Sequence, residues 1–186
     1  KAIKERFALG AFNASNLETI QAIVNAAKNL SSPILIECSP GEINYLGLQR
    51  AVHLTRSFEE ETQIPIILNL DHGEQPEKIK AAVDAGFDYV HYDGGKTPFE
   101  EAIKIGRELS KYAHKKGVLI EGEIDHIEGS SSDHTDESPN VSKDLYTDPK
   151  KAKRFVEETE IDTFASFVGN LHGIYSENKH LDLNLL

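Results

Sequence analysis

The ten residues IPIILNLDHG, at positions 64–73, decide how the fold is interpreted. Their apolar run is typical of a strand buried on both faces, and it stops abruptly at Asp71, His72 and Gly73. In a parallel α/β protein the carboxyl ends of the strands line the ligand site. An acid followed by an imidazole at such an end favours a functional site, and a capping Asp beside a hydrogen-bonded His in a turn is the structural alternative.

Strand and helix patterns alternate on both sides of this stretch. The predicted strands are residues 7–13, 34–38, 64–70, 89–93, 118–124 and 163–168, and the predicted helices are residues 17–29, 46–62, 76–85, 98–117 and 148–158. A capping box from Ser15 to Glu18 is expected to open the first helix, and Gly86 is expected to close the third. Residues 125–146 are polar and are expected to form a lid or a binding loop, or else to be disordered.

Polar residues follow every predicted strand, and they distinguish between two folds. They are Asn13, Ser39, Asp71 with His72, Asp93, Glu123 and His172. A doubly wound sheet has one ligand crevice at a switch point, whereas a closed barrel brings all the strand ends together. We therefore expect an α/β protein with a TIM (β/α)8 barrel. That fold has eight strands and typically about 250 residues, so residues 1–186 are expected to form a single barrel domain, incomplete at the C-terminus and without strands seven and eight.

Composition and charge disfavour several classes of partner. The chain has 20 basic and 31 acidic residues, and its net charge of −11 disfavours a nucleic acid or an anionic membrane surface. No apolar run approaches the roughly 20 residues of a membrane span, and no signal peptide leads the sequence. The single Cys38 cannot form an internal disulfide. We therefore expect a cytoplasmic protein.

Seven short motifs lie at the strand ends and loops of this predicted barrel. They are GAFN at 10–13, the serine at 39, LDHG at 70–73, AGFDYV with YDG ending at 94, IEGEI at 120–124, YTDP at 146–149 and GNLHG at 169–173. In this order they resemble the class II, metal-dependent fructose-bisphosphate and tagatose-bisphosphate aldolases. The resemblance runs from about residue 7 to the end of the sequence, and it implies a carbon–carbon lyase of glycolysis and carbohydrate metabolism.

The resemblance also implies a zinc site. It makes His72 and His172 two of three zinc ligands, whereas the third family histidine lies in a His-Gly-Gly segment that this sequence does not contain. Independently of the family, two histidines from different strand ends, one further ligand and an open position are what a catalytic zinc requires. The resemblance places Asp93 and Glu123 at acidic positions near the metal, where they orient a ligand or hold an alternative metal position. The expected ion is zinc or another divalent metal, and a monovalent cation remains open.

Asp71 resembles the family's acid/base aspartate. The implied reaction is the reversible cleavage of a ketose 1,6-bisphosphate to dihydroxyacetone phosphate and glyceraldehyde 3-phosphate, in which Asp71 takes the C4 hydroxyl proton and zinc stabilises the enediolate. Asn13, Ser39 and Gly173 match substrate-binding positions, although Asn13 also suits a helix entry and Ser39 a turn. A homo-oligomer, either a dimer or a tetramer, is expected.

Two departures from the family pattern leave the sugar open. The stretch after the second histidine is Gly173-Ile174-Tyr175-Ser176, which lacks a phosphate-binding lysine that many relatives carry there. The family glutamate that moves the C3 proton has no clear counterpart, and Glu128, Asp136 and Glu137 are the candidates. The epimer at C4 therefore stays undetermined.

Two competing functions remain. A Schiff-base aldolase would need a lysine near a strand end, and Lys96 is the candidate, with a solvated loop lysine as the alternative. A degenerate or truncated barrel would bind a phosphosugar or a metal without catalysis. The remaining six histidines are expected to be structural or solvated: His53, His91, His114, His126, His134 and His180.

Overall fold

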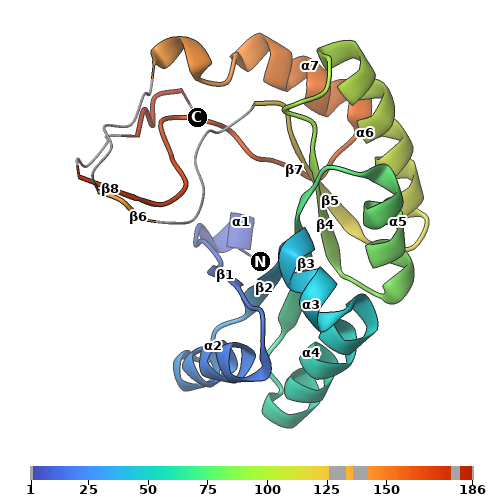
Figure 1. Cartoon of the computed structure of the whole chain (residues 1–186), viewed down its shortest axis with the longest axis vertical. Helices are drawn as coiled ribbons and strands as arrows, with labels where there is room; N and C mark the ends of the chain where they lie inside the picture. The colour runs from blue at the N-terminus through green and yellow to red at the C-terminus, as the bar shows by residue number, and fades with distance from the viewer. Residues whose placement is uncertain (1, 126–132, 136–141, 177–180, 186) are drawn as a thin grey trace.

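The computed structural model describes residues 2–125, 133–135, 142–176 and 181–185, and within them one parallel sheet curves inside a layer of helices (Figure 1). The strands of this sheet, in spatial order, are β1 (Ala11–Asn13), β2 (Ile34–Cys38), β3 (Ile66–Gly73), β4 (Tyr89–Asp93), β5 (Leu119–Glu123) and β7 (Thr163–Phe164). Every neighbouring pair is parallel and the spatial order follows the chain, as successive βαβ units require. The predicted TIM-barrel fold class is confirmed for these strands.

Helices connect the strands on the convex side of the sheet (Figure 1). They are α2 (Leu17–Leu30), α3 (Pro40–Leu46), α4 (Leu48–Thr62), α5 (Pro76–Ala85), α6 (Phe99–His114) and α7 (Pro149–Thr159), with a 3-10 turn η1 at Lys143–Leu145. The short helix α1 (Ala2–Glu5) precedes β1 and lies on the concave side (Figure 1). A second ladder, apart from the main sheet, pairs β6 (Asp133–His134) with β8 (Ile174–Tyr175). No helix in the described ranges is long and apolar enough to cross a membrane.

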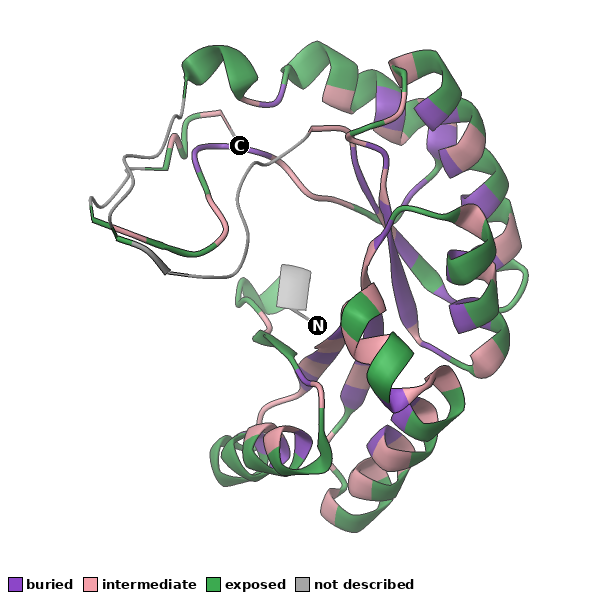
Figure 2. Cartoon of the chain, viewed as in Figure 1, coloured by how far each residue is buried: buried purple, intermediate pink, exposed green. Residues whose placement is uncertain are grey.

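Alternation along the strands gives the sheet two different faces. The outward residues Ile36, Leu68, Val90 and Ile120 are each 0% exposed and pack among the helices (Figure 2). Burying such a side chain contributes about 1.5–3 kcal/mol. The alternate residues of the same strands face the barrel interior and are mostly polar: Glu37, Asn69, Asp71, Tyr89, His91, Asp93, Glu121 and Glu123. The core therefore lies outside the sheet, and the polar groups gather inside it.

Two helix starts differ from the prediction. The capping box from Ser15 to Glu18 is wrong, because Asn16 is the N-cap of α2 and its side chain accepts the Thr19 N–H at 2.8 Å. Ser39 does not simply turn the chain; it caps α3, a helix that the sequence analysis missed. The predicted helix over residues 46–62 is instead divided at Gly47, whose φ of 85° ends α3 and leaves α4 to begin at Leu48.

Other boundaries follow the sequence closely or shift at the strand ends. Helix α5 begins at Pro76 and ends at Ala85. Gly86 is its C-cap in the left-handed conformation, and the Gly86 N–H donates to the carbonyls of Ala82 and Val83, as expected. The first and last predicted strands shorten to Ala11–Asn13 and Thr163–Phe164. The central strand extends to Gly73, so its functional residues lie inside the strand. The expected 125–146 loop falls largely outside the described residues, and a single-domain organisation stays a prediction.

Candidate metal and acid–base site

A kink in β3 turns two consecutive side chains toward the barrel interior. The pairing of β3 with β4 shifts between Leu70 and Gly73, and His72 between them has a φ of 51°. In a regular strand neighbouring side chains point to opposite faces, whereas a bulge re-aims one of them. Asp71 and His72 can therefore both reach groups on the interior face.

Gly73 makes this kink possible. A Cβ at that position would lie 2.6 Å from the carbonyl oxygen of His91 and 2.6 Å from Cγ1 of Ile79. Both distances are far below ordinary contact, so only glycine lets β3 approach β4 and α5 so closely. The glycine of the Asp-His-Gly motif thus has a packing reason beside the two functional side chains.

His72 lies among three carboxylates. Its Nδ1 is 3.3 Å from Oδ2 of Asp93 and 3.9 Å from Oε2 of Glu123, and its Nε2 is 3.7 Å from Oδ1 of Asp71. The hydrogen bond with Asp93 is the main cause that raises the pKa of His72 to about 9, with further help from the Asp71 and Glu123 charges and opposition from burial. Without a bound cation, this imidazole therefore carries a proton at neutral pH.

The partner of His72 shows the reciprocal effect. Burial alone would raise the pKa of Asp93, but the hydrogen bonds from His72 and from the Gly95 N–H hold it below its usual value. When the Nδ1–H of an imidazole donates a hydrogen bond to a carboxylate, Nε2 is free to bind a metal. Such carboxylate–histidine pairs support metal ligands in many proteins. His72, Asp93 and Glu123 also form one group whose ligand atoms lie within 4.8 Å of one another. This donor set fits a divalent metal ion.

His172 reaches the same place from a distant part of the chain. Its ring centroid lies 5.4 Å from that of His72, with the two planes at 67°. His172 follows β7 in a segment bounded by Gly169 and Gly173, with φ values of 102° and 92°. The structure thus brings together the two imidazoles that the sequence analysis singled out, while their role as ligands stays a proposal.

Asn13 and Ser39 lie on the β1 and β2 side of the site. Asn13 Nδ2 donates to Oδ2 of Asp71 at 3.0 Å and to Oε2 of Glu42 at 3.3 Å. The same Glu42 oxygen accepts the Ser39 N–H at 2.6 Å, and Ser39 Oγ accepts the Glu42 N–H at 3.3 Å. Asn13 therefore orients Asp71, whereas the Ser39 hydroxyl caps α3. Gly173 is exposed, directly after His172.

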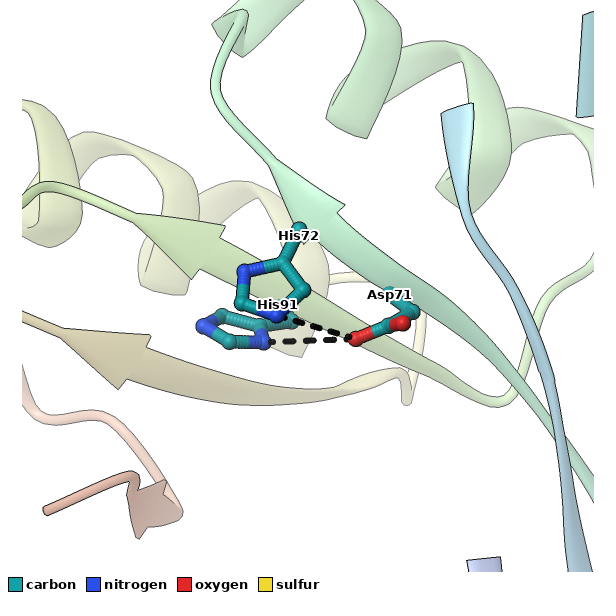
Figure 3. A group of neighbouring side chains, drawn as sticks. All are labelled: Asp71, His72 and His91. Carbon is teal, nitrogen blue, oxygen red and sulfur yellow. Dashed lines mark ion pairs between the residues drawn. The ribbon is translucent and has the colours of Figure 1, made fainter. Parts of the chain in front are cut away.

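The sequence analysis expected His91 to be structural or solvated, but its imidazole belongs to this site. It is 4% exposed, and its ring centroid lies 4.9 Å from that of His72. Figure 3 shows both rings directed at the same carboxylate oxygen of Asp71. The signal was present in the sequence, because His91 and Asp93 are two residues apart on one strand and must share a face.

The remaining candidates lie elsewhere. Lys96 is exposed and pairs with Glu74 at 2.8 Å, which raises its pKa and makes it a poor Schiff-base nucleophile. The C3-proton candidates Glu128, Asp136 and Glu137 lie outside the described residues. A cavity of about 430 Å³ borders His72, but its other walls come mainly from α3, α4 and α5, so it opens on the helix side of β3.

Comparison with known proteins gives consistent matches. A sequence model of the family described as "Fructose-bisphosphate aldolase class-II" matches residues 1–186. A fructose-bisphosphate aldolase of Giardia intestinalis is 36% identical over 100% of this chain and 56% of its own length, and one of Geobacillus stearothermophilus is 37% identical over 94% and 60%. The chain thus spans less than two thirds of these relatives.

Solved structures match the fold over a similar share. A putative fructose-1,6-biphosphate aldolase from Coccidioides immitis has a TM-score of 0.83 and 32% identity, covering 98% of this chain and 63% of that one. The YdjI aldolase from Escherichia coli K12 has a TM-score of 0.82 and 27% identity, covering 99% and 63%.

Proposed function

The chain belongs to the class II fructose-bisphosphate aldolase family, and on that premise we propose that it carries the metal and acid–base chemistry of an aldolase that reversibly cleaves a ketose 1,6-bisphosphate. The products are dihydroxyacetone phosphate and glyceraldehyde 3-phosphate. The observation that carries this proposal is the meeting of His72 and His172, 100 positions apart, at 5.4 Å between ring centroids beside Asp71.

His72 and His172 would hold the divalent ion, which we propose to be zinc, together with at least one further ligand. The hydrogen bond to Asp93 directs Nε2 of His72 away from that carboxylate, and Glu123 adds negative charge beside the same ring. When bound, the ion supplies Lewis-acid stabilisation of the negative charge that develops on the ketone oxygen as the carbon–carbon bond breaks.

Asp71 moves the proton. In the cleavage direction its carboxylate takes the C4 hydroxyl proton, the C3–C4 bond breaks, and C4 leaves as the aldehyde while the bonding electrons pass toward the ketone. In the condensation direction the same carboxyl returns the proton. The Asn13 amide holds Oδ2 of Asp71 at 3.0 Å, so the other oxygen is the one directed to the reacting group. Asn13, Ser39 and Gly173 remain proposed substrate contacts.

A coupled assay with fructose and tagatose bisphosphates, with and without a chelator, tests this function. We expect cleavage of at least one substrate, its loss on chelation and its recovery with zinc. Substrate binding without turnover in the zinc-loaded protein would favour the alternative of a degenerate barrel. Covalent trapping of Lys96 by borohydride would instead favour a Schiff base.

The cytoplasmic location, the dimer or tetramer and the monovalent cation remain predictions from the sequence. Cell fractionation and light scattering of the intact protein would measure the first two.

A further inference from the structure

Glu42 is a carboxylate at the edge of the site that the proposed mechanism does not use. It lies in the first turn of α3 and is half-buried. Its Oε2 accepts the Ser39 N–H at 2.6 Å and an N–H of the Asn13 amide at 3.3 Å. Within the part of the chain that the structure describes, no Lys, Arg or His forms an ion pair with this carboxylate. Its negative charge is therefore balanced only by neutral N–H groups.

The groups of the site lie in an order that the substrate chain can follow. Asp71 lies between His72, whose Nε2 is 3.7 Å from Oδ1, and Asn13, whose Nδ2 is 3.0 Å from Oδ2. In the proposed reaction the ion at His72 stabilises charge on the C2 oxygen, and Asp71 takes the C4 hydroxyl proton. Since C5 and C6 follow C4, they extend past Asp71, away from the ion and toward Asn13 and Glu42.

A 1,6-bisphosphate would bring a phosphate group to this edge of the site. Phosphate groups are bound through N–H donors and cations. Here the Ser39 N–H already donates to Glu42, and the Asn13 amide nitrogen donates to Glu42 and to Asp71. The chain's own carboxylate thus occupies donors that a phosphate would need. A phosphate would also meet the like charge of Glu42, which is unfavourable at a binding surface.

A hydroxyl group at the same place would avoid this repulsion. It can donate a hydrogen bond to Oε1 of Glu42, which accepts none from the other described residues. A hydrogen bond from a neutral donor to a carboxylate is stronger than one between two neutral groups. The edge of the site at Glu42 is therefore better suited to an uncharged, hydroxylated end of a sugar than to a phosphorylated end.

We propose that Glu42 is a specificity-determining residue, which discriminates against a phosphate at the far end of the sugar and accepts a hydroxyl group there. This inference rests on the proposed function and deepens it, because it names ketose 1-phosphates with a hydroxylated tail as the favoured substrate class. A 1,6-bisphosphate binds in the same place with a penalty. Glu42 acts through the difference between the two substrates and transfers no proton in the reaction.

The ratio of kcat/KM for fructose 1,6-bisphosphate to kcat/KM for fructose 1-phosphate tests this role in the intact, zinc-loaded protein. Glu42→Gln removes the charge, and its amide oxygen can still accept the Ser39 N–H, so the capping of α3 is preserved. We expect the ratio to rise about tenfold, because loss of the like charge favours only the bisphosphate. Exposed Glu61, on α4, provides the matched control, and Glu61→Gln should leave the ratio unchanged.

A binding measurement gives the same preference without turnover. Hexitol 1,6-bisphosphate and hexitol 1-phosphate lack the ketone, so they can bind but cannot be cleaved. Calorimetry on the zinc-loaded protein measures the dissociation constant of each. Relative to the monophosphate, the bisphosphate should bind about tenfold more tightly to Glu42→Gln than to the wild type.

An unchanged preference in Glu42→Gln would overturn the role of Glu42, and so would an equal rise in Glu61→Gln. If Glu42→Gln does not fold, as judged by circular dichroism, Glu42→Ala replaces it; the same rise is expected, because alanine also removes the charge. If the wild type cleaves neither substrate, the proposed function fails, and the binding preference alone decides the role of Glu42. The two proposals therefore fail separately.

Discussion

The two faces of the sheet divide stability from chemistry. On the outer face, Leu68 and Val90 are 0% exposed and belong to the hydrophobic core. On the inner face of the same two strands, Asp71 and His91 are ionisable and face one another at 4.0 Å. The residues alternate along the chain, so a shift of one position would exchange the two environments. The comparison teaches that one strand can stabilise the fold with the side chains of one face and build the site with the alternate side chains of the other.

The largest effect should come from the inner face. Replacing His72 with Ala removes an imidazole proposed to hold the ion, so bound metal and bisphosphate cleavage should fall together. The loss of several kcal/mol of Lewis-acid stabilisation corresponds to roughly a thousandfold or more in kcat. Metal analysis and the coupled assay on one preparation measure both quantities. Full activity in this variant would show that His72 is not a metal ligand, and it would contradict the assignment of the chemistry to the inner face.

Asp71→Asn should separate proton transfer from metal binding on that face. The amide cannot accept the C4 hydroxyl proton, so kcat should fall about 10²- to 10⁴-fold. The ion held by His72 and His172 should remain when zinc is saturating, and the melting temperature should change little because Asp71 is half-buried. An unchanged kcat at saturating zinc would contradict the acid/base assignment.

Leu68→Ala tests the outer face. Its side chain is fully buried between the sheet and the helices, so truncation should lower the free energy of unfolding by about 2–5 kcal/mol. Denaturant unfolding measures this loss. Metal content and kcat per folded molecule should stay near the wild-type values, since no site residue is touched. A large drop in kcat with little loss of stability would show that the two faces are not independent.

Glu37→Gln should give the smallest effect, and the size of that effect should depend on pH. Burial raises the pKa of Glu37 above 4.5, although the hydrogen bond from Asn69 opposes this. Between 4.5 and the raised value the folded state binds more protons than the unfolded chain, so stability falls as pH rises through that window. The neutral Gln keeps the Asn69 contact and removes this loss.

The melting temperature of metal-stripped protein against pH measures the effect. The melting temperature of Glu37→Gln should be higher than that of the wild type at mildly alkaline pH. This difference should disappear below the pKa that Glu37 has in the unfolded chain. A gap that widens on acidification would mean that this carboxylate is stabilised in its charged form. The repulsion and desolvation of the carboxylates on the inner face would then be weaker than their burial implies.

Where local chemistry was decisive, the sequence predicted the fold well. Pro76 and Gly86 mark the two ends of α5, and strand β4 has the predicted bounds, because turn and cap residues act through their nearest neighbours. The split at Gly47 was missed, since an apolar stripe continues across it and hides the break. The cap at Ser39 was read as a turn for a similar reason: serine and proline suit both.

The site was predictable only in part. Asp71 and His72 stood out because they end an apolar run, and His172 stood out through its motif. His91 did not, because a histidine inside a strand is usually structural, and its contact with Asp71 depends on how β4 is registered against β3 and β5. That register is a tertiary property, which alternation within one strand constrains but does not fix.

The kink at His72 also limits how this motif can be transplanted. A left-handed φ at a non-glycine residue costs of the order of 1–3 kcal/mol and persists only where the surroundings enforce it. If Asp-His-Gly were grafted onto a regular strand, the carboxylate and the imidazole would point to opposite faces of the sheet. A functional transfer therefore requires the irregular strand together with the close packing at its glycine, and the Asp-His-Gly sequence alone is insufficient.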